Sequence, residues 1–266
     1  MRQELERILG SEIARDEAVA QRAVELDGLT AFIDTRMPDV WDANYLRVDR
    51  RGLDIEAILA AGEESLGAAG VGHRAIFPYD EREGERLAAE LGPRGWKIER
   101  NFYMVHRRPP DRSGAVAVEE VTLDALEDAR RAFLGPDQSD WSDDERISAE
   151  AVDQFLLRDR LYGEAGGDRW FVAREEGEVV SFCRLLADDD TAQVEDVGTL
   201  LPARGRGFAR AVILAAVRAA RSDGDRLVWL SANAEDWPRK LYERLGFELA
   251  GGDVRIYLDP PGSPRG

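Results

Sequence analysis

The stretch VEDVGTLLPARGRGFARAV (residues 194–212) joins an apolar-leaning segment to a helical one through a basic, glycine-rich turn. Glycines at such a joint let backbone N–H groups approach a ligand closely, because no Cβ intervenes. The free N–H groups at the start of the following helix, with the helix dipole behind them, favour an anion there. Arg204 and Arg206 add positive charge. The stretch therefore predicts a pyrophosphate cradle between a strand and a helix that begins at Phe208.

The spacing Arg204-x-x-Gly207-x-Ala209 resembles the R/Q-x-x-G-x-G/A signature of the GNAT superfamily of N-acetyltransferases, which bind acetyl-CoA. It is not a Walker loop, because no Gly-Lys-Ser/Thr follows. It is not the G-x-G-x-x-G dinucleotide fingerprint either, because Arg210 stands where the third glycine belongs. A glycine-rich strand–helix turn without a ligand is the plain alternative.

A second motif lies downstream, in LVWLSANAEDWPRKLYERLGF (residues 227–247). It resembles the family pattern N-x-x-A-x-x-L-Y-x-x-x-G-F, although Pro238 replaces the usual small residue and the Asn-to-Tyr spacing is long. The positions in register are Asn233, Leu241, Tyr242, Gly246 and Phe247. Two motifs in the family's order make a chance match a poor explanation.

The resemblance implies that the pantetheine arm lies along the strand that contains Gly198, with the pyrophosphate on the turn. A glycine at 198 would let the thioester lie close. The residues expected to bind acetyl-CoA are Val197, Gly198, Thr199, Arg204, Gly205, Arg206, Gly207, Phe208, Ala209 and Asn233.

The resemblance also places a carboxylate base on this strand, at Glu195 or Asp196. Adjacent strand residues point to opposite faces, so only one of the two can enter the cleft. We favour Glu195 as the catalytic base, with surface carboxylates as the alternative. Tyr242 is the expected general acid for the CoA thiolate, since its ordinary pKa of ~10 suits that proton transfer. The alternative is that Tyr242 is a core residue.

Other chemistries find little support in the sequence. His73 and His106 both lie in the first half, so the second half has no histidine for a Ser–His–Asp or zinc site, and we expect no metal. Cys183 is expected to be a core residue rather than a nucleophile. A single cysteine also suits a reducing cytosol.

Charge and hydropathy restrict the partners. The formal net charge is −17, which argues against nucleic acid binding. No apolar run approaches a membrane span, and the N-terminus lacks a signal-peptide core. We expect a cytoplasmic protein, monomer or homodimer. Residues 119–164 contain fourteen Asp/Glu and five Arg, which favours a small cationic amine as acceptor.

The expected fold is α/β (α+β): a mixed central sheet flanked by helices, GNAT-like, in two similar halves. We expect a degenerate GNAT-like domain over 1–110, a catalytic domain over 113–258, and a disordered tail over 259–266; an unrelated α/β extension is the alternative for the first half. Expected helices are 3–25, 53–69, 81–91, 123–133, 142–158, capped by Ser142, 208–222 and 236–245. Expected strands are 29–35, 44–48, 73–78, 96–106, 116–121, 170–174, 179–186, 191–201, 227–231 and 254–258.

The sequence thus predicts an acetyl-CoA-dependent N-acetyltransferase that acts by direct attack of a primary amine. Two alternatives remain at this point: an acyl-CoA-binding or interaction module without transferase activity, and a transferase that uses a longer acyl-CoA.

Overall fold

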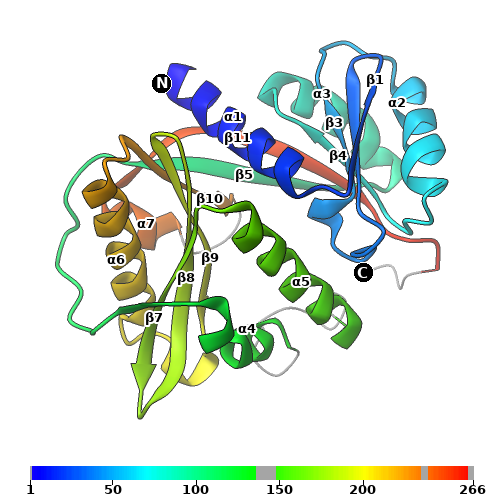
Figure 1. The fold of residues 1–266 in the computed structure, drawn as a ribbon. Coiled ribbons are helices and arrows are strands. Elements are labelled where there is room, and N and C mark those ends of the chain that lie inside the picture. The colour runs from blue at the N-terminus through cyan, green and yellow to red at the C-terminus, as the bar shows by residue number, and fades with distance from the viewer. Residues whose placement is uncertain (1, 136–147, 235–238, 263–266) are drawn as a thin grey trace. The chain divides into compact units, whose positions relative to one another are not determined.

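The computed structural model describes residues 2–135, 148–234 and 239–262 (Figure 1). Contacts divide the chain into two compact units. The C-terminal unit comprises Met1–Ser11, Tyr103–Ala232 and Asp236–Ala250, and the N-terminal unit comprises Glu12–Phe102, Asn233–Glu235 and Gly251–Gly266. The boundaries of the units fall inside α1 (Arg2–Val19), β5 (Lys97–His106), β10 (Leu227–Asn233) and β11 (Phe247–Leu258), so each unit is built from segments that are not consecutive in the sequence.

The N-terminal unit is a mixed sheet with the strand order β1-β2-β3-β4-β11. β3 and β4 are parallel, and the other neighbours are antiparallel. Its core contains aliphatic side chains from the strands and from α2 and α3. Its elements are α1 (Arg2–Val19, shared between the units), β1 (Arg22–Leu26), β2 (Leu29–Ile33), β3 (Tyr45–Val48), α2 (Ile55–Gly62) with a π-helical turn (Glu63–Gly67), β4 (Arg74–Pro78), α3 (Glu81–Leu91) and part of β5 (Lys97–His106).

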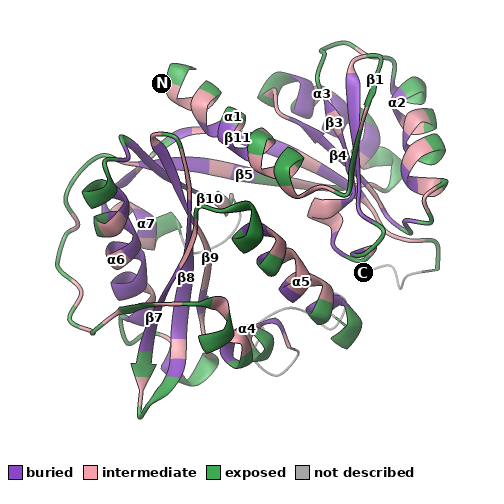
Figure 2. Ribbon diagram, viewed as in Figure 1, coloured by how far each residue is buried: buried purple, intermediate pink, exposed green. Residues whose placement is uncertain are grey.

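The C-terminal unit has the strand order β11-β5-β10-β9-β8-β7-β6. α6 packs on β7, β8 and β9, while α4 and α5 cover the other side of the same strands (Figure 1). The side of α6 that faces the sheet is buried (Figure 2). Its elements are β6 (Glu119–Val121), α4 (Glu127–Leu134), α5 (Ala149–Ala165), β7 (Asp168–Glu175), β8 (Glu178–Asp188), β9 (Thr191–Thr199), α6 (Phe208–Asp223), β10 (Leu227–Asn233), α7 (Arg239–Leu245) and β11 (Phe247–Leu258).

The predicted fold class, a mixed sheet flanked by helices, is confirmed. After β6, α4 and α5, the C-terminal unit has three strands, a helix, a strand, a helix and a final strand, and the N-terminal unit has the same series from β1 to β5, with one strand more than expected because the sequence predicts helix for residues 22–25. In each unit the third and fourth strands of this series are parallel. The strands predicted over 170–174 and 179–186 are β7 and β8, which a hairpin around Glu176-Gly177 joins.

Three predicted elements have wrong boundaries. The first helix ends at Val19 rather than residue 25, because the next residues pair as β1 with β2. The helix predicted over 142–158 is α5, which continues to Ala165 and is capped by Ser148; Ser142 lies outside the described residues. The last strand begins at Phe247 rather than 254, directly after the glycine that ends α7.

Candidate active site

The central feature of the C-terminal unit is a pair of parallel strands that separates along its length. β9 and β10 pair at Thr191–Leu227, Ala192–Val228 and Gln193–Trp229. Among the described residues of these two strands, the parallel register does not continue beyond Gln193 and Trp229. The backbone groups of the later part of β9 that face β10 are therefore not paired with β10.

The basic turn follows the open end of β9. Gly205 and Gly207 have φ values of 74° and 90°, a left-handed conformation that glycine adopts without strain. Gly207 is the N-cap of α6 and offers no side-chain oxygen, so no side chain caps the first N–H groups of this helix. A Cβ at either glycine would meet no atom within 4 Å, which means that open space lies over the turn.

The two arginines of the turn have different roles. Arg204 Nε donates to the carbonyl oxygen of Thr199 at 3.1 Å, which fastens the turn to the end of β9. Arg206 forms a two-contact ion pair with Glu175 and lies over the ring of Phe208 at 5.3 Å. The side chains of Arg206 and Glu175 are 48% and 36% exposed, so this ion pair contributes little stability.

β9 contains a bulge at the predicted catalytic position. Phe182 pairs with Gly198 and Arg184 with Glu195, so two steps along β8 match three along β9. The extra residue is Asp196, whose φ of 49° lies in the left-handed region. Strict side-chain alternation, on which the choice of Glu195 rested, therefore does not hold across 195–197.

The carboxylate of Asp196 is bound by two buried arginines. Arg130 Nη2 donates to Asp196 Oδ1 at 2.7 Å, and Arg184 Nη2 donates to Asp196 Oδ2. Burial by itself would raise the pKa of Asp196, but the two guanidinium groups outweigh it and hold that pKa well below its usual range. Asp196 is therefore a poor proton acceptor, which leaves Glu195, partly buried, as the candidate base on this strand.

Packing within the sheet requires a glycine at position 198. A Cβ at this position would lie 2.4 Å from the ring of Phe182, so the space is filled by a core side chain. Ser181 Oγ donates to the carbonyl oxygen of Gly198 and lies 2.8 Å from Thr199 Oγ1. The structure explains this glycine by strand packing, without reference to a thioester.

The remaining predicted site residues lie on the expected elements. Tyr242 is on α7 and is buried, with its ring edge-on to Phe247 at 6.3 Å between centroids. Asn233 is the last residue of β10. Cys183 is fully buried on β8, and burial raises the pKa of its thiol, as expected of a core cysteine.

Sequence reasoning missed the buried polar cluster under α4 and α5. Arg130 and Arg184 also bind Asp159, with contacts of 2.9 and 3.1 Å. Arg184 lies 4.9 Å from the ring of Trp170. A lone charged residue inside an apolar strand, Arg184 in VVSFCRLLA, is the one signal that could have indicated it.

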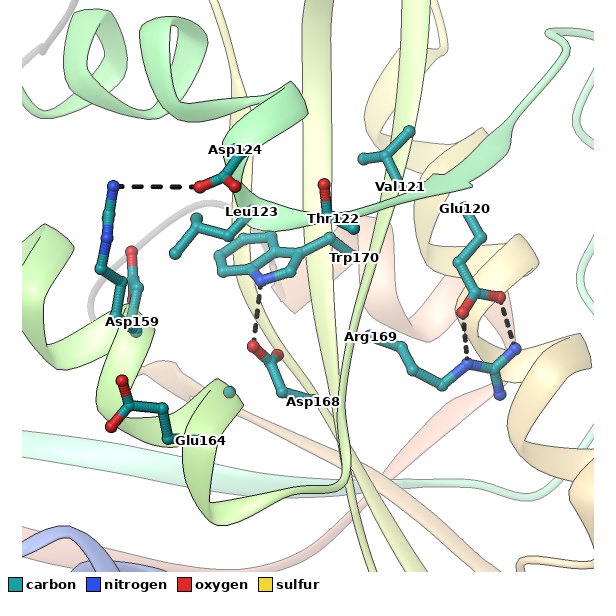
Figure 3. A pocket seen from close by; sticks show the side chains of 12 residues that line it. Glu120, Val121, Thr122, Leu123, Asp124, Asp159, Glu164, Asp168, Arg169 and Trp170 are labelled. Carbon is teal, nitrogen blue, oxygen red and sulfur yellow. Dashed lines mark hydrogen bonds and ion pairs between the residues drawn. The ribbon is translucent and has the colours of Figure 1, made fainter.

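A pocket of 710 Å³ lies between the turn after β6, the end of α5 and the start of β7 (Figure 3). Asp168 lines it and accepts a hydrogen bond from Trp170 Nε1 at 3.1 Å. Burial raises the pKa of Asp168 to about 6, although Arg184 opposes the shift. The pocket includes part of the acidic segment 119–164. Its residue Asp168 pairs with Leu186 on β8, and Leu186 pairs with Gln193 on β9, so the pocket lies beside the part of β9 around Gln193 and not beside the basic turn.

Part of the chain matches a known protein family. Residues 124–247 match the model of the acetyltransferase (GNAT) family. The chain contains a GNAT-family domain. The GNAT domain begins before α4 and ends at the start of β11, so it includes the open strand pair and the basic turn.

Solved structures extend the likeness of fold to the N-terminal half. A functionally unknown conserved protein from Staphylococcus epidermidis is 14% identical, with 91% of this chain and 94% of that chain covered and a TM-score of 0.69. A GCN5-related N-acetyltransferase from Kribbella flavida is 20% identical over 96% and 95% of the two chains, with a TM-score of 0.63. One from Sphaerobacter thermophilus is 17% identical over 88% and 78%, with a TM-score of 0.58. No curated protein matches.

The described residues form neither a metal cluster nor a membrane-spanning helix. In residues 2–135, 148–234 and 239–262, no group of three or more His, Cys, Asp or Glu side chains is placed to hold a metal ion. Within the same ranges, no helix is both long and apolar enough to cross a bilayer.

Proposed function

We propose that this protein transfers an acetyl group from acetyl-CoA to a primary amine of a small molecule. The observation that carries the proposal is that the segment matching the GNAT family folds as an open parallel strand pair followed by an uncapped, glycine-rich helix start. An extended pantetheine arm fits the free edge of β9, and a pyrophosphate fits the N–H groups at the start of α6.

The charges of the turn support the same placement. Phosphate oxygens accept stronger, charge-assisted hydrogen bonds from a guanidinium than neutral acceptors do. Arg206 can exchange its exposed partner Glu175 for a phosphate at little cost, because that ion pair is solvated. Arg204 keeps its bond to Thr199 and contributes its charge from a fixed position.

The proposed reaction is direct. The amine nitrogen attacks the thioester carbonyl carbon, the C–S bond breaks, and the CoA thiolate leaves. Glu195 takes the proton that the amine nitrogen loses, and Tyr242 gives one to the thiolate. No acyl-enzyme is needed, and the only cysteine is buried in the core.

The N-terminal unit provides no second cradle of this kind. Its corresponding joint is the turn between β3 and α2, and here Asp54 caps the helix by accepting a hydrogen bond from the N–H of Ala57. A carboxylate at the helix start repels a phosphate, so we propose one acetyl-CoA site per chain.

The acceptor is proposed to be a cationic amine, because the segment 119–164 is strongly acidic. Purified protein is incubated with acetyl-CoA and a panel of cationic, neutral and anionic amines, and acetylated products are detected by mass spectrometry. Turnover of cationic amines supports the proposal. Acetyl-CoA binding without any product supports the binding-module alternative, and turnover of only neutral or anionic amines contradicts the acceptor class.

Two exposed arginines offer a matched control. Arg206→Ser removes a guanidinium from the basic turn, whereas Arg174→Ser removes one that pairs with Glu119 on the neighbouring strand. Weaker acetyl-CoA binding is expected for the first variant only. Equal affinities in both variants would count against the basic turn as the phosphate site.

A further inference from the structure

The backbone at Asp196 is in the left-handed conformation, which Asp adopts more readily than most residues with a Cβ but less readily than glycine. Its φ is 49°, and left-handed backbone is sterically costly for residues with a Cβ. Such a conformation persists only where the surrounding structure fixes it, and such positions cluster at functional sites. Asp196 directly follows the candidate base Glu195 on β9.

The contacts of the Asp196 side chain show what fixes it. Arg130 on α4 binds Oδ1, and Arg184 on β8 binds Oδ2. The side chains of these arginines are 4% and 1% exposed, and that of Asp196 is 18% exposed. Each carboxylate oxygen therefore has its own cationic donor, and the carboxylate cannot rotate without breaking a buried ion pair.

The two arginines are themselves held in place. Asp159 on α5 binds Arg130 Nε at 2.9 Å and Arg184 Nη2 at 3.1 Å. The guanidinium of Arg184 also lies 4.9 Å from the ring of Trp170 and 5.0 Å from that of Tyr162. The clamp, defined here as Arg130 and Arg184, thus connects two helices to one residue of β9.

Stability alone is a weak reason for such a cluster. Burying ions costs desolvation, and apolar replacements of a buried ion pair are often neutral or stabilising. A buried ionic cluster is better explained where it fixes the conformation of a particular segment. Here that segment is the bulge at Asp196, directly after Glu195.

We propose that Arg130 and Arg184 are positioning residues that hold Asp196 in its left-handed conformation and thereby set the direction of Glu195. The inference rests on the proposed function, in which Glu195 accepts the amine proton. It assigns Asp196 no proton transfer of its own.

The first test compares Asp196→Gly with Asp196→Ala. Both variants remove the carboxylate and leave the same arginines, but only glycine adopts a φ of 49° without strain. We expect kcat of the alanine variant to be roughly tenfold lower than that of the glycine variant. KM for acetyl-CoA should be unchanged in both, because the basic turn is not altered. Equal kcat values would overturn the proposal.

The second test places Arg130→Lys in two backgrounds. A lysine keeps the charge but cannot bond Asp159 and Asp196 in the arginine's geometry. We expect a lower kcat in the wild-type background and no further loss in the Asp196→Gly background, where no clamp is needed. An equal loss of kcat in both backgrounds would show that Arg130 acts independently of Asp196, and that result would also overturn the proposal.

Crystal structures keep this test separate from the proposed function. If the wild-type protein acetylates no amine, the proposed function fails, but the backbone at 196 can still be observed. Loss of the bulge and a turned Glu195 in Asp196→Ala, with both retained in Asp196→Gly, supports the clamp. A retained bulge in the alanine variant refutes it. Should neither Asp196 variant fold, the structure of Arg130→Lys decides in the same way.

Discussion

Asp168 offers a sharp test of the buried charges in the C-terminal unit. Its side chain is 5% exposed, and its pKa is raised from 3.8 to about 6 by burial. The group therefore binds a proton more tightly in the folded than in the unfolded state. Its favourable contribution to stability is fully present below pH 3.8 and is lost as the pH rises through about 6.

The magnitude follows from the size of the shift. One pKa unit corresponds to about 1.36 kcal/mol, so the full shift is worth about 3 kcal/mol, of which about 2 kcal/mol is lost between pH 4 and pH 7 because pH 4 already lies above the unfolded pKa. Asp168→Asn has no such titration, and its side-chain oxygen can still accept the hydrogen bond of Trp170 Nε1. The free energy of unfolding of the variant minus that of the wild type should therefore rise by about 2 kcal/mol over this range.

The assay is urea unfolding of both proteins at intervals from pH 4 to pH 7. The quantity compared is how the difference in free energy of unfolding between variant and wild type changes with pH, because the substitution can also change stability by an amount that is the same at every pH. Glu164→Gln is the control, since it removes an exposed carboxylate from the same pocket (Figure 3). A difference between Asp168→Asn and wild type that is constant with pH, or that falls as pH rises, would refute the reasoning.

Three further predictions concern the site. Isothermal titration should give one acetyl-CoA site per chain, and charge reversal at Arg204 and Arg206 should weaken binding and flatten its salt dependence; two equivalent sites would contradict this. Tyr242→Phe should lower kcat by roughly 10²-fold at nearly unchanged acetyl-CoA affinity, and an unchanged kcat with rate-limiting chemistry would make Tyr242 a core residue. Gly198→Ala should destabilise the fold by about 1–3 kcal/mol in urea unfolding, because its Cβ would overlap the Phe182 ring; wild-type stability would exclude that clash.

The sequence by itself determined most of the local elements and the glycine-rich turn after β9. Glycines at 205 and 207 and the apolar periodicity after Phe208 are local signals, since turn conformation and helix formation depend mainly on residues close in the chain. The strands on either side of Glu176-Gly177 and the order of elements in the second half could be predicted for the same reason. The two motifs that indicated the GNAT family, in residues 194–212 and 227–247, are each short continuous stretches of sequence.

Only the tertiary structure decided how the candidate base is held. The bulge at Asp196 arises because β8 and β9 differ by one residue between the same pairs, and pairing register is a property of two strands. The two arginines of the clamp lie far from Asp196 in the sequence: Arg130 is 66 residues away and Arg184 is 12 residues away. Likewise, Gly198 is explained by the ring of Phe182 on the neighbouring strand. Such contacts depend on which side chains the fold brings together, and no local pattern encodes that.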